Sequence, residues 1–349
     1  MKAKTLNRQS KPRVTVKDLA RDLGMSVSTV SRAFYADAVI APTTREAVLA
    51  RAQEIGYKPN PFAQSLITKK TQIVGMVVSD INNPFYPEVM TRLTEDLQAI
   101  GMNVMLVAAS DSAKVDDAVR LLLSYQPDLV IILAASLSSE AMRECRVAGS
   151  PCIFFNRLSL DPECFGVSCD NREGGRRAAD FLIDRNHRAL AYVSAFPDAS
   201  TNVERKEGFV DRAKERGVAE PVVIEAGRFS YDAGYAAADA FAALPFRPDG
   251  VFCANDILAI GFIEGVREKL GLDVPKHLSV IGFDDISMAH WPSHSLTTIR
   301  QPVDEMLATT VEFARALAAN PEEKPVVRRI VPSAVIERNT TRWRMEETE

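Results

Sequence analysis

The chain has 349 residues, of which 46% are hydrophobic and 25% are charged, a composition typical of a soluble globular protein with a sizeable core. This length predicts two to three domain units. No stretch approaches the roughly 18 consecutive apolar residues that a membrane-spanning helix needs. The N-terminal segment MKAKTLNRQSKPR lacks the apolar run of a secretory signal, so we expect a cytoplasmic protein.

Charge is segregated along the chain. Residues 1–70 contain 13 Lys and Arg against 5 Asp and Glu, a formal charge of +8, whereas residues 71–349 carry −12. This segregation is typical of a nucleic-acid-binding head on an acidic body. The five cysteines form no CxxC pair, which favours reduced, packed thiols over a disulfide framework.

The stretch from 15 to 35 predicts two short helices joined by a tight turn. The first helix has an apolar face of residues spaced three and four apart, namely Val16, Leu19, Ala20 and Leu23. Thr15 and Asp18 form a potential capping box at its start. Gly24 allows the chain to leave the helix, and Ser26 can cap the second one.

The second helix of this stretch separates into two faces. Its inward face comprises Val30, Ala33 and Phe34, and its outward face comprises Val27, Ser28, Ser31 and Arg32. Together the two helices predict a helix-turn-helix whose second helix fits a DNA major groove. A three-helix core without a DNA role would give the same pattern, but the basic charge of residues 1–70 favours DNA binding.

Two further helices are predicted before the body of the protein. A capping box at 43–46 predicts the start of a third helix that ends at Gly56. Pro61 suits the first turn of a short helix over 60–67. Because isolated helices under about 12 residues are marginal in water, we expect this last segment to order only with DNA and a second copy present.

From Gln72 onward, short apolar runs alternate with amphipathic helical patterns, which predicts parallel sheets in α/β layers. The runs lie at 73–78, 104–109, 129–133, 152–155, 190–193, 222–224, 251–254 and 279–283. They are more numerous than one compact sheet usually needs. We therefore predict two subdomains.

Polar side chains follow many of these runs, at the strand ends where such sheets bind ligands. They include Asp80, Asn83, Asn156, Arg157, Arg205, Asn255, Asp256, Asp284 and Asp285, with Phe85, Tyr86, Phe155 and Trp291 as nearby aromatic rings. Carboxylates, amides, arginine and stacking rings suit a polyhydroxylated ligand. Each polar residue also fits a turn or a helix cap, and we expect Asp256 and Asp285 to be structural.

These motifs resemble those of the lac repressor/galactose repressor family of bacterial transcription regulators. The resemblance extends from about residue 13 to 343 and is carried by TVKDLARDLGMSVSTVSR, TTREAVLARAQEIGYKPN, AQSL, DINNPFY, ERKEGF, CANDILAIG, IGFDDI and LTTIRQP. It implies a helix-turn-helix domain over 1–59, a hinge helix and linker over 60–71, and a periplasmic-binding-protein-like domain over 72–345. This last domain would bind the effector and dimerise, with one lobe at about 72–168 and 298–329 and the other at about 169–297 and 330–345.

The resemblance also implies roles for individual residues at the DNA. The hinge helix would enter the minor groove, with Leu66 wedged between base pairs and the small Ala63 close to the groove. On the recognition helix we predict that Arg32, Ser28 and Val27 contact bases. The remaining predicted DNA contacts are Thr15, Ser26, Thr29 and Ser31, which would hold phosphates, and Asn60 in the hinge segment.

For the effector, the resemblance implies hydrogen bonds from Arg205, Asn255 and Asp284, with Phe85 in the cleft. Asp80, Asn156 and Trp291 complete the predicted effector set. Asn156 departs from the family, where sugar-binding members commonly have aspartate at this position. The departure leaves the particular ligand open.

The sequence therefore predicts a DNA-binding transcriptional regulator, a repressor, that binds a palindromic operator on the nucleoid as a homodimer and responds allosterically to a sugar or sugar derivative. We expect no cofactor and no catalytic site, since no Walker loop or GxGxxG follows a strand. Pro292 between His290 and His294 argues against a helical metal site. The alternatives are a purine or nucleoside effector, a solute-binding protein without DNA function, and a sugar-processing enzyme.

Overall fold

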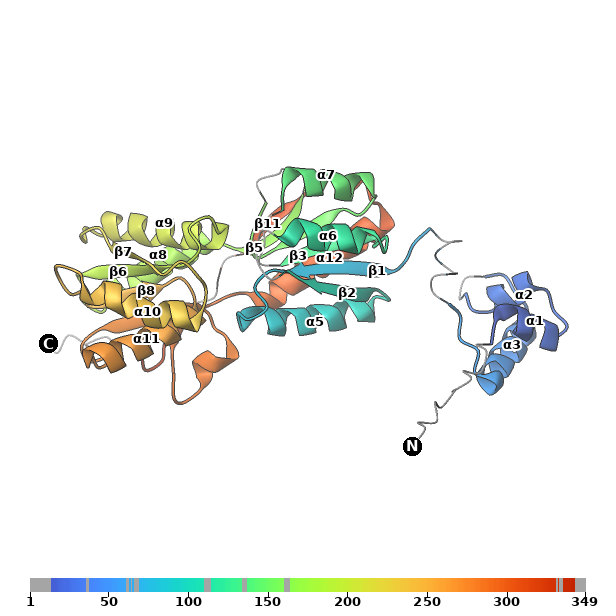
Figure 1. Cartoon of the computed structure of the whole chain (residues 1–349), viewed down its shortest axis with the longest axis horizontal. Coiled ribbons are helices and arrows are strands. Elements are labelled where there is room, and N and C mark those ends of the chain that lie inside the picture. The colour runs from blue at the N-terminus through green and yellow to red at the C-terminus, as the bar shows by residue number, and fades with distance from the viewer. Residues whose placement is uncertain are drawn as a thin grey trace, which may run out of the picture. The chain divides into compact units, whose positions relative to one another are not determined.

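The computed structural model describes residues 14–35, 38–60, 63, 65, 69–109, 114–133, 137–159, 164–330, 332 and 335–342. The chain divides into two compact units, residues 1–71 and 72–349 (Figure 1). Leu66 and most of the predicted hinge helix lie outside the described residues. The same holds for the basic arm before residue 13 and the charged tail after 342.

The first unit is built on α1 (Val16–Asp22), α2 (Val27–Arg32) and α3 (Pro42–Ile55). Their core includes Leu19, Val30 and Val48, none of which is exposed. The predicted capping box is confirmed, because the Asp18 carboxylate accepts from the Thr15 N–H at 3.0 Å while the Thr15 hydroxyl accepts from the Asp18 N–H. The Ser26 cap is also confirmed: its hydroxyl accepts from the Thr29 N–H at 3.0 Å.

The predicted capping box at 43–46 is wrong. Helix α3 begins at Pro42, with Ala41 as its N-cap and no side-chain cap. Proline has a preset φ and no N–H to satisfy, so it starts the helix upstream of the threonines. Arg45, in this first turn, instead donates to the backbone carbonyls of the loop after α2, which are those of Ala33, Tyr35 and Ala38.

The second unit contains two six-stranded sheets. The first has the order β11-β5-β4-β3-β1-β2 and the second β12-β10-β9-β8-β6-β7. The strands of the first sheet are β1 (Ile73–Val78), β2 (Asn103–Ala108), β3 (Leu129–Leu133), β4 (Cys152–Phe155), β5 (Phe165–Cys169) and β11 (Val327–Ile330). Those of the second are β6 (Leu190–Ser194), β7 (Val222–Glu225), β8 (Gly250–Cys253), β9 (Ser279–Asp284), β10 (Thr297–Arg300) and β12 (Val335–Ile336). All neighbouring strands are parallel except the antiparallel β10–β12 pair.

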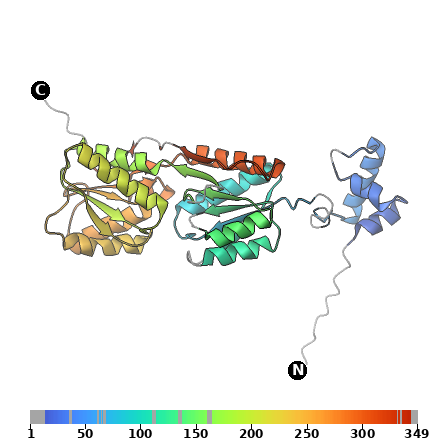
Figure 2. The ribbon, with the colours of Figure 1, turned by 90° about the horizontal axis from the view of Figure 1, so that it is seen from above.

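Helices cover both faces of each sheet, so the second unit has two α/β lobes (Figure 2). In the first lobe, α5 (Phe85–Ala99) and α12 (Val303–Ala319) cover one face, and α6 (Val115–Leu123) and α7 (Ser139–Val147) cover the other. In the second lobe, one layer comprises α8 (Asn171–Ile183) and α9 (Ser200–Glu215), and the other α10 (Tyr231–Ala242) and α11 (Asp256–Leu270). A 3₁₀ turn, η2 (Ser287–His290), follows β9.

The eight apolar runs all became strands, but four strands went unpredicted: β5, β10, β11 and β12. Strand β11 is an exposed edge with the sequence VRRI, so it lacks the apolar run that marks a buried strand. Strand β10 buries polar side chains, since the Thr297 hydroxyl lies 2.9 Å from that of Thr341. Between β5 and α8, between β10 and α12, and between β11 and β12, the chain crosses from one lobe to the other.

The bonds of Arg45 generate a stability prediction. Arg45→Met removes charged donors from several buried carbonyls, and hydrogen bonds to charged groups contribute about 1.5–3 kcal/mol each. We expect hydrogen exchange of the α3 amides in the full chain to accelerate accordingly. Arg51→Met, which removes only exposed ion pairs to Asp22 and Glu54, is the control and should have a smaller effect. Equal exchange rates in the two variants would contradict the role of Arg45.

Candidate nucleic-acid interface and ligand cleft

A groove of about 370 Å³ runs over the first unit, between the start of α1, helix α2 and the segment after α3. Five of the predicted DNA contacts line it: Thr15, Val27, Ser31, Asn60 and Ala63. They come from three separate stretches of sequence. The fold therefore places the recognition helix and the start of the hinge segment around one depression.

The outward face of α2 is already ordered by its own side chains. The Arg32 guanidinium donates from Nη2 to the Ser28 hydroxyl at 2.9 Å, one helical turn away. The Ser26 and Thr29 hydroxyls lie 2.8 Å apart at the N-terminus of the helix. Val27 is 43% exposed between these two pairs. This face presents a cation, small hydroxyls and one apolar group, which are the groups that contact base edges and phosphates.

Sequence patterns missed Tyr35 and Lys58, which also line the groove. The Tyr35 hydroxyl is buried and has no hydrogen-bond partner within the described part of the chain. A phosphate oxygen entering the groove would satisfy this donor. Tyr35 follows α2 directly, so its position after the recognition helix was the available signal.

In the second unit, a second set of predicted residues meets at the carboxyl ends of the two sheets. A cavity of about 10 Å³ is lined there by Asn83, Tyr86, Asn156 and Arg157 from the first lobe and by Thr201, Arg205, Phe229, Asn255 and Asp284 from the second. Four predicted effector residues, Asn156, Arg205, Asn255 and Asp284, are thus brought together. Asp80 lies close enough to Arg157 for the guanidinium to act on its pKa, which burial raises and Arg157 lowers.

Arg205 is the central group of this cavity and is only 2% exposed. Its guanidinium donates to the Ala254 carbonyl at 2.6 Å and to Asn171 Oδ1 at 2.9 Å, and lies 3.3 Å from Asp284 Oδ1. It also lies 3.6 Å above the Phe283 ring. These contacts fix the guanidinium plane before any ligand arrives.

Close packing of α8 against α9 sets the position of Arg205. A methyl group added at Gly175 would lie 2.2 Å from the Arg205 carbonyl oxygen, and one at Gly208 would lie 2.0 Å from that of Arg172. Only glycine fits such a close approach of two helices. The ERKEGF segment therefore contains both the arginine and one glycine that lets its helix pack.

Burial raises the pKa of the Asp284 carboxyl, and the neighbouring Arg205 opposes this shift. Gln301 Nε2 donates to Asp284 Oδ1 at 2.7 Å. The backbone at Asp284 has a φ of +117°, and that at Asn156 a φ of +69°. Residues whose backbone is held in such sparsely populated conformations cluster at binding sites.

Three buried acceptors in this region have no hydrogen-bond partner within the described residues: Asp80 Oδ2, Asn156 Oδ1 and Gln301 Oε1. The Asn156 amide nitrogen donates to the Tyr86 hydroxyl at 3.0 Å, which leaves its oxygen free. An unsatisfied buried acceptor costs about 1–3 kcal/mol. The site therefore favours a ligand with several O–H or N–H donors.

The remaining predicted effector residues lie elsewhere or act differently. Trp291 is 50% exposed, stacks on His294 and does not line the cavity, so its effector role stays a prediction. Phe85 packs edge-on against Tyr86 behind the cavity. Asn255 also caps α11, accepting from the Leu258 N–H at 3.2 Å.

Sequence patterns missed Thr201, Phe229 and Gln301. Gln301 follows β10, a strand that was not recognised, so the rule of inspecting strand ends could not reach it. Phe229 contributes through the ring contact that it makes with the Arg157 guanidinium at 5.3 Å. This contact joins the two lobes.

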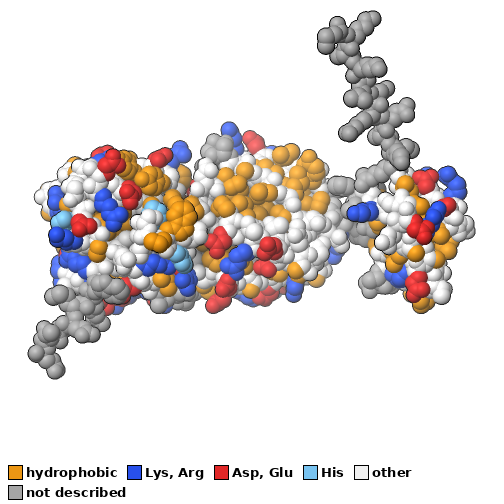
Figure 3. Space-filling view, turned by 90° about the horizontal axis from the view of Figure 1, so that it is seen from below, with side chains coloured by type: hydrophobic (Ala, Val, Ile, Leu, Met, Phe, Trp, Pro, Cys, Tyr) orange, Lys and Arg blue, Asp and Glu red, His pale blue; other side chains and the backbone are white. Residues whose placement is uncertain are grey.

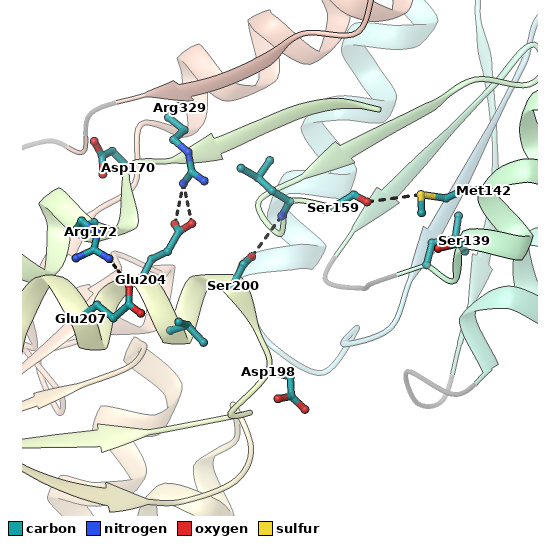
Figure 4. Close-up of a pocket in the computed structure, with 13 residues that line it drawn as sticks. Ser139, Met142, Ser159, Asp170, Arg172, Asp198, Ser200, Glu204, Glu207 and Arg329 are labelled. Carbon is teal, nitrogen blue, oxygen red and sulfur yellow. Dashed lines mark hydrogen bonds and ion pairs between the residues drawn. The ribbon is translucent and has the colours of Figure 1, made fainter. Parts of the chain in front are cut away.

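A wider cleft of about 880 Å³ lies between the lobes, next to the sites of Ser200 and Leu158 (Figure 4). The Leu158 N–H donates to the Ser200 hydroxyl at 3.3 Å, and Arg329 from β11 pairs with Glu204 from α9. Both contacts link side chains of different lobes. Charged residues line much of this cleft, among them Asp170, Arg172, Asp198 and Glu207.

Metal-ion and membrane-spanning features are absent from the described part of the chain. No cluster there of three or more His, Cys, Asp or Glu side chains fits a metal ion. None of the described helices combines the length and apolarity needed to cross a bilayer. The five cysteines are buried, as the sequence predicts.

Asp256 and Asp285 prove structural, as expected from the sequence. The buried Asp256 carboxylate accepts from the Ile286 N–H at 2.9 Å and from the Thr298 hydroxyl. Burial raises the pKa of Asp256 well above its usual value. Asp285 forms ion pairs with Arg300 and Arg338.

A helix-turn-helix head with a groove-fitting second helix, joined in one chain to a two-lobed ligand-binding fold, defines a DNA-binding transcriptional regulator. Comparison with known proteins identifies the family. Residues 15–60 match the model "Bacterial regulatory proteins, lacI family", and residues 179–341 match "Periplasmic binding protein-like domain". The chain belongs to the lacI family of bacterial regulatory proteins.

Individual relatives agree with this assignment. The chain is 32% identical over 293 residues to the HTH-type transcriptional repressor PurR of Vibrio atlanticus, covering 82% of this chain and 87% of that protein. A transcriptional regulator CelR–cellobiose complex is similar with a TM-score of 0.69 and 25% identity, covering 94% and 100% of the two chains. The lac repressor dimer bound to operator and the anti-inducer ONPF shares the fold, with a TM-score of 0.83, 23% identity and coverage of 94% and 99%.

The raised pKa of Asp256 predicts a pH dependence of stability. A carboxyl whose pKa is higher in the folded than in the unfolded state stabilises the protein at low pH, and this contribution is lost as the pH rises above the usual carboxyl value of about 4. Asp256→Asn cannot titrate, so we expect its free energy of unfolding to fall less between pH 4.5 and 8 than that of the unmodified chain. Urea unfolding measures this. Asp239→Asn, which alters an exposed carboxylate, should keep the original slope, and an unchanged slope in Asp256→Asn would contradict the assignment.

Proposed function

We propose that this regulator is a repressor that binds a palindromic operator as a homodimer and is controlled by a sugar or sugar derivative held between the lobes of its second unit. The observation that carries the effector class is a cavity wall with the anchored Arg205, an unpartnered acceptor on Asn156 and an unpartnered donor on Asn255. Two further unpartnered acceptors lie on Asp80 and on Gln301, the latter bonded to the lining residue Asp284. A polyol supplies a donor to each acceptor, and its hydroxyl oxygens accept from Arg205. The similarity to a cellobiose-bound regulator supports the same class.

The proposed DNA-binding surface comprises the groove and the outward face of α2. Arg32 pairs with a guanine, Ser28 bonds a base edge and Val27 packs on a thymine methyl. The phosphates are held by Thr15, Ser26, Thr29 and Ser31, while Asn60, Ala63 and Leu66 form the minor-groove segment. The protein then acts in the cytoplasm, on the nucleoid, by binding rather than by catalysis.

A second copy is the proposed partner of the second unit. Strand β2 is an edge strand of the first sheet, and Leu106 on it is 46% exposed. Leu121 and Tyr125, from α6 and the turn that follows it, are similarly exposed. Figure 3 shows apolar side chains gathered on this face of the first lobe and also on the adjoining part of the second. An uncovered edge with apolar side chains favours pairing with another chain, and a two-fold dimer matches a palindrome.

The switch follows from where the cavity lies. The cavity is lined by residues of both lobes, so an effector bound there contacts both of them. The effector shifts the populations of the open and closed lobe arrangements only if it binds one arrangement more tightly than the other. Coupling between the effector site and the operator site is then reciprocal. If the effector changes the affinity for DNA by some factor, DNA changes the affinity for the effector by the same factor.

The recognition helix generates the first functional prediction. Arg32→Ala removes one base contact, which discriminates by about 1–3 kcal/mol, or about 5- to 150-fold. We expect gel-shift titrations to show that the ratio of operator affinity to random-duplex affinity falls by this factor. The affinity for the effector should stay unchanged. Arg21→Ala removes the same charge from an 80% exposed side chain on α1 and serves as the control. Unaltered discrimination in Arg32→Ala would refute the base contact.

The cavity between the lobes generates the second functional prediction. A thermal-shift screen of sugars, sugar acids and purines identifies the effector, and calorimetry on the full chain then measures its affinity. We expect Asp284→Ala to lower that affinity tenfold or more, because Arg205 loses its buried partner, while operator binding persists. Asp284→Asn, which keeps the side-chain shape, separates loss of charge from loss of packing, and Asp239→Ala is the surface control. Stabilisation by purines alone would overturn the sugar assignment, and undiminished affinity in Asp284→Ala would remove that residue from the site.

A further inference from the structure

One ion pair joins the two lobes beside the ligand cavity. Arg329 lies on β11 of the first lobe, and Glu204 lies on α9 of the second. Arg329 Nη1 is 2.8 Å from both carboxylate oxygens of Glu204 (Figure 4). Both residues line the wider cleft between the lobes.

The same carboxylate is connected to the central arginine of the cavity. Asn171 Nδ2 donates to Glu204 Oε2 at 3.4 Å, and Asn171 Oδ1 accepts from Arg205 Nε at 2.9 Å. Asn171 is 1% exposed, so water competes little for these bonds. A continuous path of contacts therefore runs from Arg329 to the group that faces the ligand.

If the lobes moved apart, only one contact along this path would change in length. Asn171, Glu204 and Arg205 belong to α8 and α9, which move together because their backbones touch at Gly175. Arg329 moves with the first lobe, since β11 is hydrogen-bonded to β5. Separation of the lobes must lengthen the contact between Arg329 and Glu204 and can leave the others intact.

We infer that Glu204 and Arg329 form a lobe latch: the pair holds the lobes in the arrangement described here, where the cavity is only about 10 Å³, and opens to admit the effector. This inference rests on the proposed effector role of the cavity. Glu204 and Asn171 are then positioning residues that link the latch to Arg205. A pair whose side chains are 20% and 45% exposed is modest in strength, but a modest interaction is sufficient to change a near-balanced two-state equilibrium about three- to tenfold.

A distance measurement without any ligand tests the latch. Spin labels on introduced cysteines at Gln98→Cys in α5 and Lys214→Cys in α9 report lobe separation in the full chain, since the native cysteines are buried. We expect Glu204→Gln and Arg329→Gln each to raise the population of longer distances threefold or more. The double variant should add little to either single change, because both remove the same interaction.

The chain supplies a matched control beside the latch. Arg328, the neighbour of Arg329 on β11, forms an arginine–glutamate pair of its own with Glu312 of α12, through Nη1 and Nη2 at 2.6 and 2.8 Å. This pair lies within the first lobe, so Arg328→Gln and Glu312→Gln should leave the distances unchanged. Equal shifts in the latch and control variants, or additive shifts in the double variant, would overturn the inference.

A second measurement separates the latch from the proposed function. With an effector from the screen, stopped-flow association should be about threefold or more faster in Glu204→Gln, because opening precedes entry. Unchanged distances in the latch variants overturn the latch, whatever binds. If the distances change in the latch variants but no ligand of the screen binds at the cavity, the latch is supported and the proposed effector site is rejected.

Discussion

The second unit depends on one buried cation. Taking a guanidinium out of water is costly unless every donor finds an acceptor and the charge is paired. Arg205 pairs its charge with Asp284 and donates to the Ala254 carbonyl and to Asn171 Oδ1, so the protein itself meets most of this requirement. These partners stand at the ends of strands and helices that are far apart in sequence. The second lobe must therefore be assembled correctly before its ligand-binding groups are placed.

Helix packing and the ligand cleft are linked through backbone contacts. At Gly175 and Gly208 the backbones of α8 and α9 approach too closely for any side chain, so these helices behave as one rigid element. The first lobe reaches the cavity instead through side chains, such as Arg157 against Phe229. Rigid contacts within a lobe and replaceable contacts between lobes are the combination that a two-state hinge requires.

The two units of the chain use different means of stabilisation. The head has a small core, and much of its local order comes from capping side chains and from Arg45 on the loop after α2. The outward face of α2 is already ordered by the Arg32–Ser28 and Ser26–Thr29 hydrogen bonds, so the proposed contact with DNA requires few side chains to reorder. The body has a large core on both faces of its first sheet, and several of the unsatisfied buried polar atoms of its described residues lie at the cavity between the lobes.

Local patterns in the sequence determined those features that depend on neighbours along the chain. The helix-turn-helix with its Thr15 and Ser26 caps, and the eight strands that coincide with apolar runs, follow from periodicity, capping chemistry and hydrophobicity. The strand-end rule placed Asn255 and Asp284 among many polar candidates, and the resemblance to the lac repressor/galactose repressor family singled them out together with Arg205, which lies in α9.

Only the tertiary structure decided what depends on distant partners. Gln301 was missed because its strand buries threonines that are satisfied by a segment some forty residues later. The start of α3 changed because Pro42 outweighed a threonine cap. The pairing of Arg329 with Glu204 exists only because two lobes meet there, since a single charged side chain in a sequence does not indicate which opposite charge it will reach.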